Sequence, residues 1–356
     1  MHKSLLVPAD EREAHVRWFR RIGMLLGAAI GFVLTLWAAA ALYFDFTFPR
    51  LRVVVALLYL AVIVRAIVYL RRSKLVLAVP VVGFLVVLGW WLTLKATNDG
   101  DWQPDNAQTA SIDFNGDAVT VHNFRLCTYK TEADYTCEWQ TRSYDLSKLH
   151  AVDIFITWWG SPWIAHPIVS FDFGDQGHIA MSIETRDLVG QSYSAVRGFF
   201  RQYALIYVVT DERDVILLRT NYRKGEEVHI FRTNINPETA RKLFGDYAAR
   251  VNQLHNRPEW YNAVTNNCTT NIAVSAAQAN SRRTRLDWRV LLNGKSDEMM
   301  YEHGGIATGG LPIARLREQA HINSVAQKVG NDPEFSRLIR VGRVGFPEAG
   351  AAAGAN

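Results

Sequence analysis

The sequence predicts an α+β domain preceded by three membrane-spanning helices. Two observations carry this prediction. Long uncharged apolar runs are concentrated at the front of the chain, and strand-like alternation mixes with capped, helix-period segments in the rest. The strands and helices do not follow the regular strand–helix–strand order of a parallel sheet, which favours the α+β class. The 356 residues are enough to bury a sizeable core.

Three apolar runs are the predicted spans, over residues 22–44, 51–70 and 75–94. Each provides the roughly 20 residues that cross a bilayer. Lys and Arg are more frequent in the segments on the side of the amino terminus, so the positive-inside rule places residues 1–21 in the cytoplasm and the chain after Lys95 outside it. Residues 22–95 form the membrane part, 96–110 a linker, 111–340 the exported domain and 341–356 a disordered tail.

The exported part has a series of short periodic segments. Helices are expected at residues 194–203, 237–254, from 268 onward and at 312–319. Residues 159–163 and 174–177 are expected to form turns. Strands are expected at residues 118–124, 151–158, 167–173, 178–184, 205–209, 214–219 and 228–232.

All three cysteines lie in the exported part, where an oxidising compartment permits disulfides. Cys127 and Cys137 flank a hairpin-like segment that a disulfide would close, and this pairing leaves Cys268 as the odd thiol. Pairing of Cys268 with either of the other two would contradict a catalytic role for it.

Cys268 follows two asparagines and begins an alanine-rich helical pattern. A thiol in the first turn of a helix lies near unpaired N–H groups and the positive end of the helix dipole, which favour the nucleophilic thiolate. The side chain of Asn267, or the N–H of Cys268, would donate to an oxyanion. The alternative is a buried thiol with only a packing role.

A cysteine nucleophile needs a base, and the base needs a group that orients it. His166 and His178 lie at the starts of two strands in one predicted hairpin, and Glu184 ends the second strand. Antiparallel pairing would bring Glu184 opposite the start of the first strand, where it would orient His166. The structural alternative is that the histidines only form hydrogen bonds and that Glu184 pairs with Arg186 on the surface.

Five separate blocks of the exported part share a pattern with one known family: Trp159–His166, Ser182–Arg186, Gly198–Tyr203, Asp211–Arg213 and Asn266–Asn271. In this order they resemble the periplasmic domain of Lnb-type proteins, a bacterial family linked to lipoprotein N-acylation. The resemblance covers residues 102–338. That domain is similar in turn to the circularly permuted, NlpC-like form of the papain-like fold, in which the histidine strand precedes the cysteine helix.

The resemblance implies roles for particular residues. Cys268 would be the nucleophile, His166 the base and Glu184 the third polar group, with His178 and Asn267 as secondary candidates. Together with the three predicted spans, it implies a multi-pass bacterial inner-membrane enzyme with a periplasmic domain, which moves an acyl chain from a phospholipid through a cysteine thioester to an acceptor such as a lipoprotein amino terminus. The Lnb proteins with assigned activity carry a different membrane part. Alternatives are a cysteine hydrolase acting on lipid esters or peptidoglycan amides, and a non-catalytic membrane module.

The charge of the chain and its lack of certain motifs exclude several classes of function. The formal charge is +5, and no basic helix with interleaved aromatic residues points to nucleic acid as a partner. No zinc-ligand spacing, Walker motif or dinucleotide fingerprint occurs. We therefore expect neither a cofactor nor a metal. The resemblance and the spans imply membrane phospholipid as a partner, with lipoproteins as the expected acceptors.

Overall fold

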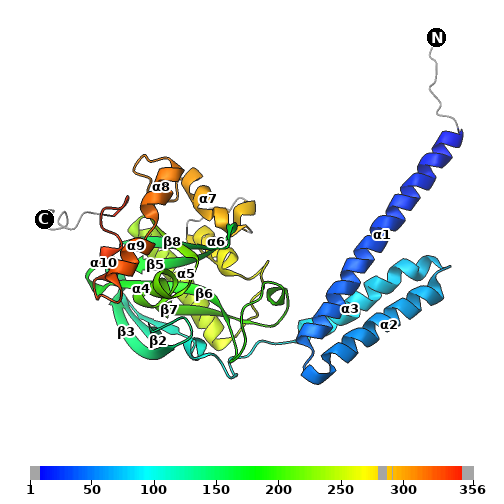
Figure 1. Ribbon diagram of the computed structural model, residues 1–356, viewed down its shortest axis with the longest axis horizontal. Coiled ribbons are helices and arrows are strands. Elements are labelled where there is room, and N and C mark those ends of the chain that lie inside the picture. The colour runs from blue at the N-terminus through cyan, green and yellow to red at the C-terminus, as the bar shows by residue number, and fades with distance from the viewer. Residues whose placement is uncertain (1–8, 280–286, 291, 347–356) are drawn as a thin grey trace, which may run out of the picture. The chain divides into compact units, whose positions relative to one another are not determined.

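A computed structural model describes residues 9–279, 287–290 and 292–346 (Figure 1). The chain divides into two compact units. One contains Met1–Lys95 and Phe200–Gln202, and the other contains Ala96–Phe199 and Tyr203–Asn356. Each unit is described by itself.

The first unit is built from three helices, α1 (Ala9–Asp45), α2 (Arg52–Leu70) and α3 (Ala78–Thr93). Three stretches within it are long and apolar enough to cross a membrane: Arg17–Asp45, Pro49–Leu70 and Lys74–Thr93. They coincide with the three predicted spans. Most of their large apolar side chains are exposed, as is expected for surfaces that face lipid.

The second unit is built on a mixed sheet of order β1-β2-β7-β6-β5-β4-β8, with β3 paired to β2. All pairs are antiparallel except β2 with β7. The strands are β1 (Ser111–Asn115), β2 (Ala118–Tyr129), β3 (Tyr135–Asp145), β4 (Ala151–Trp159), β5 (Ser161–Asp172), β6 (His178–Arg186), β7 (Ala204–Thr210) and β8 (Glu226–Arg232).

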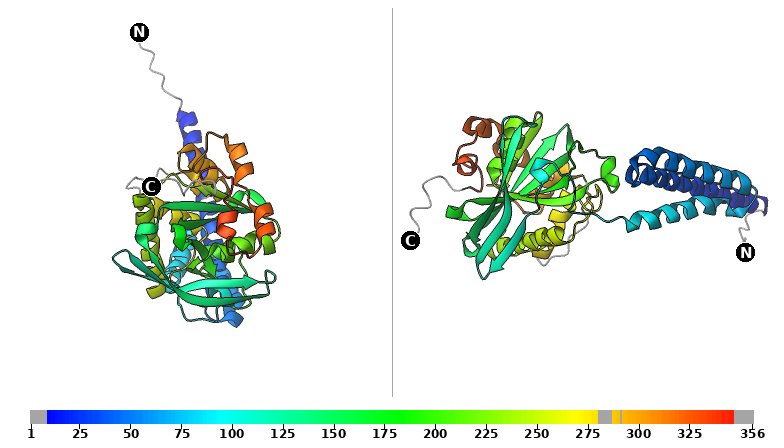
Figure 2. Two further views of the ribbon diagram at one scale, coloured as in Figure 1. Left: turned by 90° about the vertical axis from the view of Figure 1, so that its left-hand side faces the viewer. Right: turned by 90° about the horizontal axis from the view of Figure 1, so that it is seen from below.

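Helices cover both faces of this sheet (Figure 2). Side chains point to alternate faces along a strand, so β5 contributes to both cores. On one face Phe171 packs on Tyr247 of α5, and on the other Ile168 belongs to the core beside α4, α9 and α10. The helices are α4 (Glu212–Leu217), α5 (Pro237–Asn256), α6 (Cys268–Ala279), α7 (Ser296–Glu302), α8 (Ile313–Ala320), α9 (Asn323–Val329) and α10 (Phe335–Leu338). The α+β prediction is confirmed.

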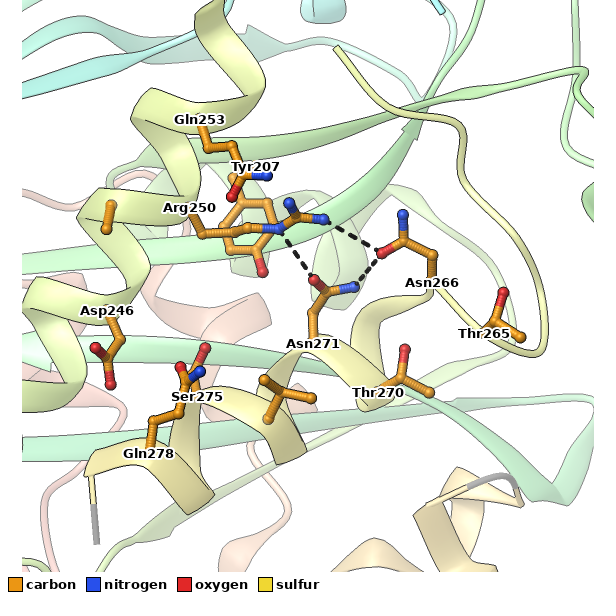
Figure 3. Close-up of a pocket in the computed structure, with 12 residues that line it drawn as sticks. Tyr207, Asp246, Arg250, Gln253, Thr265, Asn266, Thr270, Asn271, Ser275 and Gln278 are labelled. Carbon is orange, nitrogen blue, oxygen red and sulfur yellow. Dashed lines mark hydrogen bonds between the residues drawn. The ribbon is translucent and has the colours of Figure 1, made fainter. Parts of the chain in front are cut away.

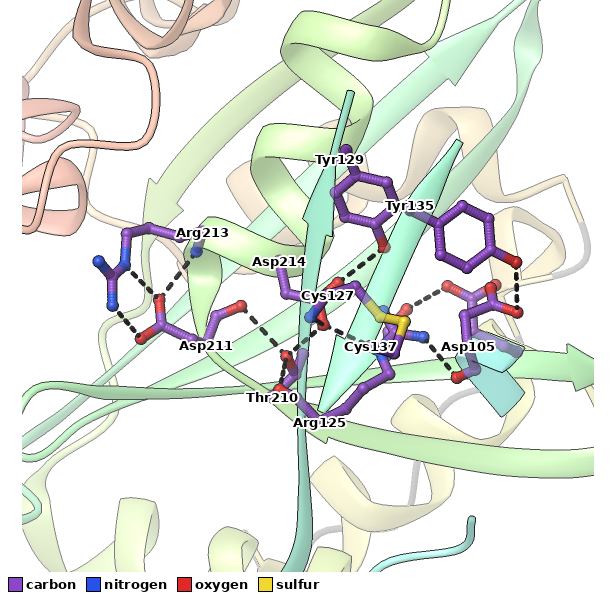
Figure 4. A network of polar contacts seen from close by, with 12 residues as sticks. Asp105, Arg125, Cys127, Tyr129, Tyr135, Cys137, Thr210, Asp211, Arg213 and Asp214 are labelled. Atoms are coloured by element: carbon purple, nitrogen blue, oxygen red, sulfur yellow. Dashed lines mark hydrogen bonds and ion pairs between the residues drawn. A yellow bond between two sulfur atoms is a disulfide. The ribbon is translucent and has the colours of Figure 1, made fainter. Parts of the chain in front are cut away.

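The segment expected as a strand at residues 214–219 is helical, and the prediction was wrong there. Asp211 caps α4, since its side chain accepts a hydrogen bond from the N–H of Arg213, and a π-helical turn, Leu218–Tyr222, continues the helix. Asp214 is buried and accepts hydrogen bonds from Arg125 and Tyr129 of β2 (Figure 4). This buried ion pair fixes α4 against the sheet, a tertiary constraint that local propensity does not report.

Other boundaries also differ from the prediction. Residues 194–203 contain only a short 3₁₀ turn, Arg197–Phe199, instead of a helix. The turn at 159–163 is reduced to a reversal at Gly160, whose φ of 64° suits a glycine, so β5 begins at Ser161. The expected linker is packed into the second unit, because Asn106 is buried and its carbonyl accepts from Arg186. In the expected tail, Phe346 is buried as well, and residues 347–356 lie outside the described residues.

Cys127 and Cys137 face each other in the β2–β3 ladder and form a disulfide, whereas Cys268 is free (Figure 4). We therefore expect one alkylated thiol per chain when the unreduced protein is denatured in iodoacetamide, and three after reduction. Peptide mapping by mass spectrometry should locate the single unreduced label on Cys268. A label on Cys127 or Cys137 would contradict the assignment, because it would place Cys268 in a disulfide.

Candidate active site

Cys268 is the first residue of α6, and Asn267 caps that helix. The side-chain oxygen of Asn267 accepts from the N–H of Thr270 at 3.0 Å, which is N-cap geometry. Its amide nitrogen donates to the carbonyl of Ala263 at 2.7 Å. The Asn267 side chain therefore fixes the helix start and is engaged away from the thiol.

The thiol itself is buried but not sealed, with 8% of Cys268 exposed. It belongs to the same core cluster as Tyr207, Tyr247 and Tyr261. The backbone N–H of Cys268 has no hydrogen-bond acceptor among the described residues, as expected for the first turn of a helix. A polarised oxygen near the sulfur would find this donor free.

Asn293 lies beside the thiol, although no sequence pattern predicted a role for it. Its side-chain nitrogen is 3.9 Å from the Cys268 sulfur and donates to the Thr269 hydroxyl at 2.8 Å. Its side-chain oxygen accepts from the N–H of Ala165 at 2.8 Å. The next residue, Gly294, packs so closely on the β4–β5 hairpin that a Cβ there would overlap the backbone of that hairpin. Asn293 is thus held between β5 and α6.

His166 is buried on β5, beside the end of its ladder with β6. The last ladder pair is Ile168 with Ser182, so His166 and Glu184 lie just beyond it. The Nε2 atom of His166 is 2.8 Å from the Ser182 hydroxyl and 3.1 Å from the Glu184 carboxylate. Ser182 in turn donates to Glu184 at 2.6 Å. The structure brings His166 and Glu184 together as the register predicts, and adds Ser182 between them.

The electrostatics of this group favour a charged histidine. Burial opposes the charged form, but the Glu184 carboxylate raises the pKa of His166 to about 9, and a hydrogen bond to the Cys268 thiol also raises it. Burial likewise opposes ionised Glu184, yet His166 and Arg219 hold its pKa well below the ordinary value. At neutral pH the pair is therefore an imidazolium and a carboxylate, with the thiol in contact with the imidazolium.

Arg219 completes the group from the π-helical turn after α4. Its guanidinium donates to Glu184 at 3.0 Å and to Glu226 at 3.1 Å. Arg219 is buried, so its two carboxylate partners offset the cost of removing its charge from water. Arg219 and His166 contact the same oxygen of Glu184, so the arginine helps to fix the carboxylate beside the imidazole. The sequence did not reveal it, because residues 214–219 were expected to form a strand.

His178 lies at the opposite end of the β5–β6 hairpin from His166. Its Nε2 atom is 3.6 Å from Asp172, and Asp153 lies close to both. Such a trio could hold a cation, but Arg232 pairs with both carboxylates and Arg340 pairs with Asp153. We interpret the cluster as structural, because these guanidiniums already supply the positive charge.

Arg186, the alternative partner for Glu184, makes its hydrogen bonds elsewhere. Arg186 is buried and donates to Asn98 and to the carbonyls of Asn106 and Ala107. It ties the first residues of the second unit to the end of β6.

A cavity of about 380 Å³ lies between α5 and α6 (Figure 3). Arg250 lines it, held by two hydrogen bonds of 2.7 Å to Glu259. Asn266 and Asn271 contribute further polar atoms. Cys268 does not line this cavity, so it is separate from the thiol.

The residues around the Cys268 thiol lie in a segment that matches a known family. Residues 135–294 match the Lnb N-terminal periplasmic domain family. The match confirms the resemblance predicted from the sequence and spans Cys268, His166, Glu184 and Asn293. Neither curated proteins nor solved structures gave a match. Residues 135–294 are thus similar to this periplasmic domain family, and three helices before them are long and apolar enough to cross a membrane.

The ion pair in the Lnb domain should make stability depend on pH. The pKa of His166, about 9 when folded, lies above its ordinary 6.5, so its contribution is complete below pH 6.5 and is lost as pH rises through 9. We expect His166→Gln to lower the thermal midpoint of the full chain more at pH 6 than at pH 10. His122→Gln removes an exposed histidine 3.0 Å from Asp113 and serves as the control. A His166→Gln effect that is the same at both pH values would contradict the ion pair.

Proposed function

We propose that the Lnb domain is a cysteine acyltransferase that takes an acyl chain from a phospholipid and passes it to an amine, such as a lipoprotein amino terminus. The supporting observation is a free thiol at a helix start, in contact with a histidine that Glu184 keeps protonated. A cationic histidine in contact with a thiol favours the thiolate. The order of histidine strand and cysteine helix is also that of a permuted papain-like fold, which forms part of this proposal.

The first half-reaction would form a thioester. The Cys268 sulfur attacks the carbonyl carbon of the lipid ester, and the ester C–O bond breaks as the tetrahedral intermediate collapses. The leaving lysophospholipid alkoxide takes a proton from His166. A histidine with a pKa near 9 is protonated at neutral pH and is therefore able to act as the acid in this step.

The second half-reaction would return the enzyme to its starting state. The acceptor amine attacks the thioester carbon, the C–S bond breaks and His166 accepts the proton that the amine loses. Glu184, fixed by Ser182 and Arg219, orients His166 throughout. Because the chain has three candidate spans, it is held in the membrane that also contains both lipid substrates.

Two donors are available for the oxyanion in each half-reaction. They are the free N–H of Cys268 and the side-chain N–H of Asn293, 3.9 Å from the sulfur. Donors in place before the reaction stabilise the developing charge without reorganisation.

The proposal predicts an acyl adduct on Cys268. The full chain, purified with phospholipid of defined acyl length, should show a mass increase of one acyl group that hydroxylamine removes and that Cys268→Ala lacks. Adding a peptide with a diacylglyceryl-cysteine amino terminus should transfer the group to that peptide. Release of free fatty acid alone would indicate a hydrolase, and absence of any adduct would contradict the thiol chemistry.

Asn293→Ala should slow adduct formation about 100-fold, in the range seen when one oxyanion donor is removed. Asn293 also bonds Thr269, so Thr269→Val is the matched control that removes this bond and keeps the amide. Initial rates of adduct formation with both variants, at several lipid concentrations, separate turnover from binding. Equal rates in Asn293→Ala and Thr269→Val would show that Asn293 has only a structural role.

A further inference from the structure

The end of the sheet that carries the site also carries large exposed apolar side chains. β5 begins, β6 ends and β7 begins at this end, where His166 and Glu184 lie. The β4–β5 hairpin and the loop between β6 and β7 extend from it. We call their exposed apolar residues the apolar rim: Trp163, Ile164, Val189, Tyr193, Val196 and Phe199.

Both parts of the rim are joined to the thiol by short hydrogen-bonded paths. On the hairpin side, Ala165 follows Ile164 and donates to Asn293, which lies beside the Cys268 sulfur. On the loop side, the carbonyl of Gly198 accepts from the N–H of Ala263 at 2.8 Å, and the carbonyl of Ala263 accepts from Asn267. Both parts of the rim are therefore connected to residues next to the thiol.

A short segment of chain connects the last candidate span to this end of the sheet. Helix α3 ends at Thr93, and Asn98 is already bonded to Arg186, the last residue of β6. The five Cα–Cα steps from Thr93 to Asn98 extend roughly 18 Å at most. The rim also suits a lipid interface in composition, since Trp and Tyr are amphipathic and Arg197 beside Val196 is an exposed cation.

We propose that the apolar rim rests in the interfacial layer of the bilayer that the three helices span, and that acyl chains reach Cys268 between its two parts. The route of the acyl chains to Cys268 rests on the proposed function, whereas the position of the rim in the bilayer concerns only the surface. The six apolar side chains of the rim are exposed. Contact with lipid would bury this apolar surface, and the hydrophobic effect makes such a transfer from water favourable.

The test measures the depth of single nitroxide labels in the full chain, reconstituted in phospholipid nanodiscs. Cys268→Ala provides a background without a free thiol, because Cys127 and Cys137 are paired. Ile164→Cys and Val196→Cys each place one label on the rim. Val341→Cys is the matched control, because this valine is exposed to a similar degree but adjoins Arg340, which bonds Asp153 at the opposite end of β4.

For each label, the measured quantity is the ratio of collisions with oxygen to collisions with a water-soluble nickel complex. We expect this ratio to be several-fold higher for both rim labels than for the Val341 label. Water-like ratios at either rim position would overturn the proposal and leave a protein partner as the occupant of this surface. The measurement does not depend on acyl transfer, because the Cys268→Ala background lacks the proposed nucleophile. Failure of the rim proposal is therefore distinguishable from failure of the acyl-adduct test.

Discussion

The contact between Glu184 and His166 is the interaction on which the site depends. At 3.1 Å from the buried imidazole, the carboxylate overcomes the cost of burying a charged histidine and raises the pKa of His166 to about 9. Ser182 and Arg219 restrict where that carboxylate can lie. Without Glu184, burial would favour a neutral His166, and Arg219 would lose one of its two partners. The charge state of the base and the packing of the π-helical turn therefore depend on one carboxylate.

The thiol is positioned by a different set of bonds. The cap at Asn267 fixes the first turn of α6, and Asn293 joins that turn to β5 through Thr269 and Ala165. His166 lies on β5 as well, so one strand positions both the base and the amide donor. Since β5 and β6 stop pairing at Ile168 and Ser182, the groups meet where the sheet opens. The proposed acyl transfer needs such an opening, because a lipid carbonyl would have to reach a sulfur that is otherwise in the core.

The sequence predicted the parts that local patterns and strand register determine. The period of two in β5 and β6 placed Glu184 opposite His166, and the capping pattern placed Cys268 at a helix start. Arg219 and Asn293 were beyond prediction, because each acts through a tertiary contact made by a segment with no informative pattern. Asp214 explains the wrong strand at residues 214–219: its buried pairing with Arg125 overrides the apolar alternation around it.

The most direct test of this account is the titration of the His166 ring, followed by nitrogen-15 NMR in the full chain and assigned with His166→Gln. The account predicts an inflection near pH 9 in the wild type, which moves down toward the ordinary value of about 6.5 in Glu184→Gln. A wild-type inflection near pH 6.5, unchanged in Glu184→Gln, would contradict the claim that Glu184 keeps His166 charged beside the thiol.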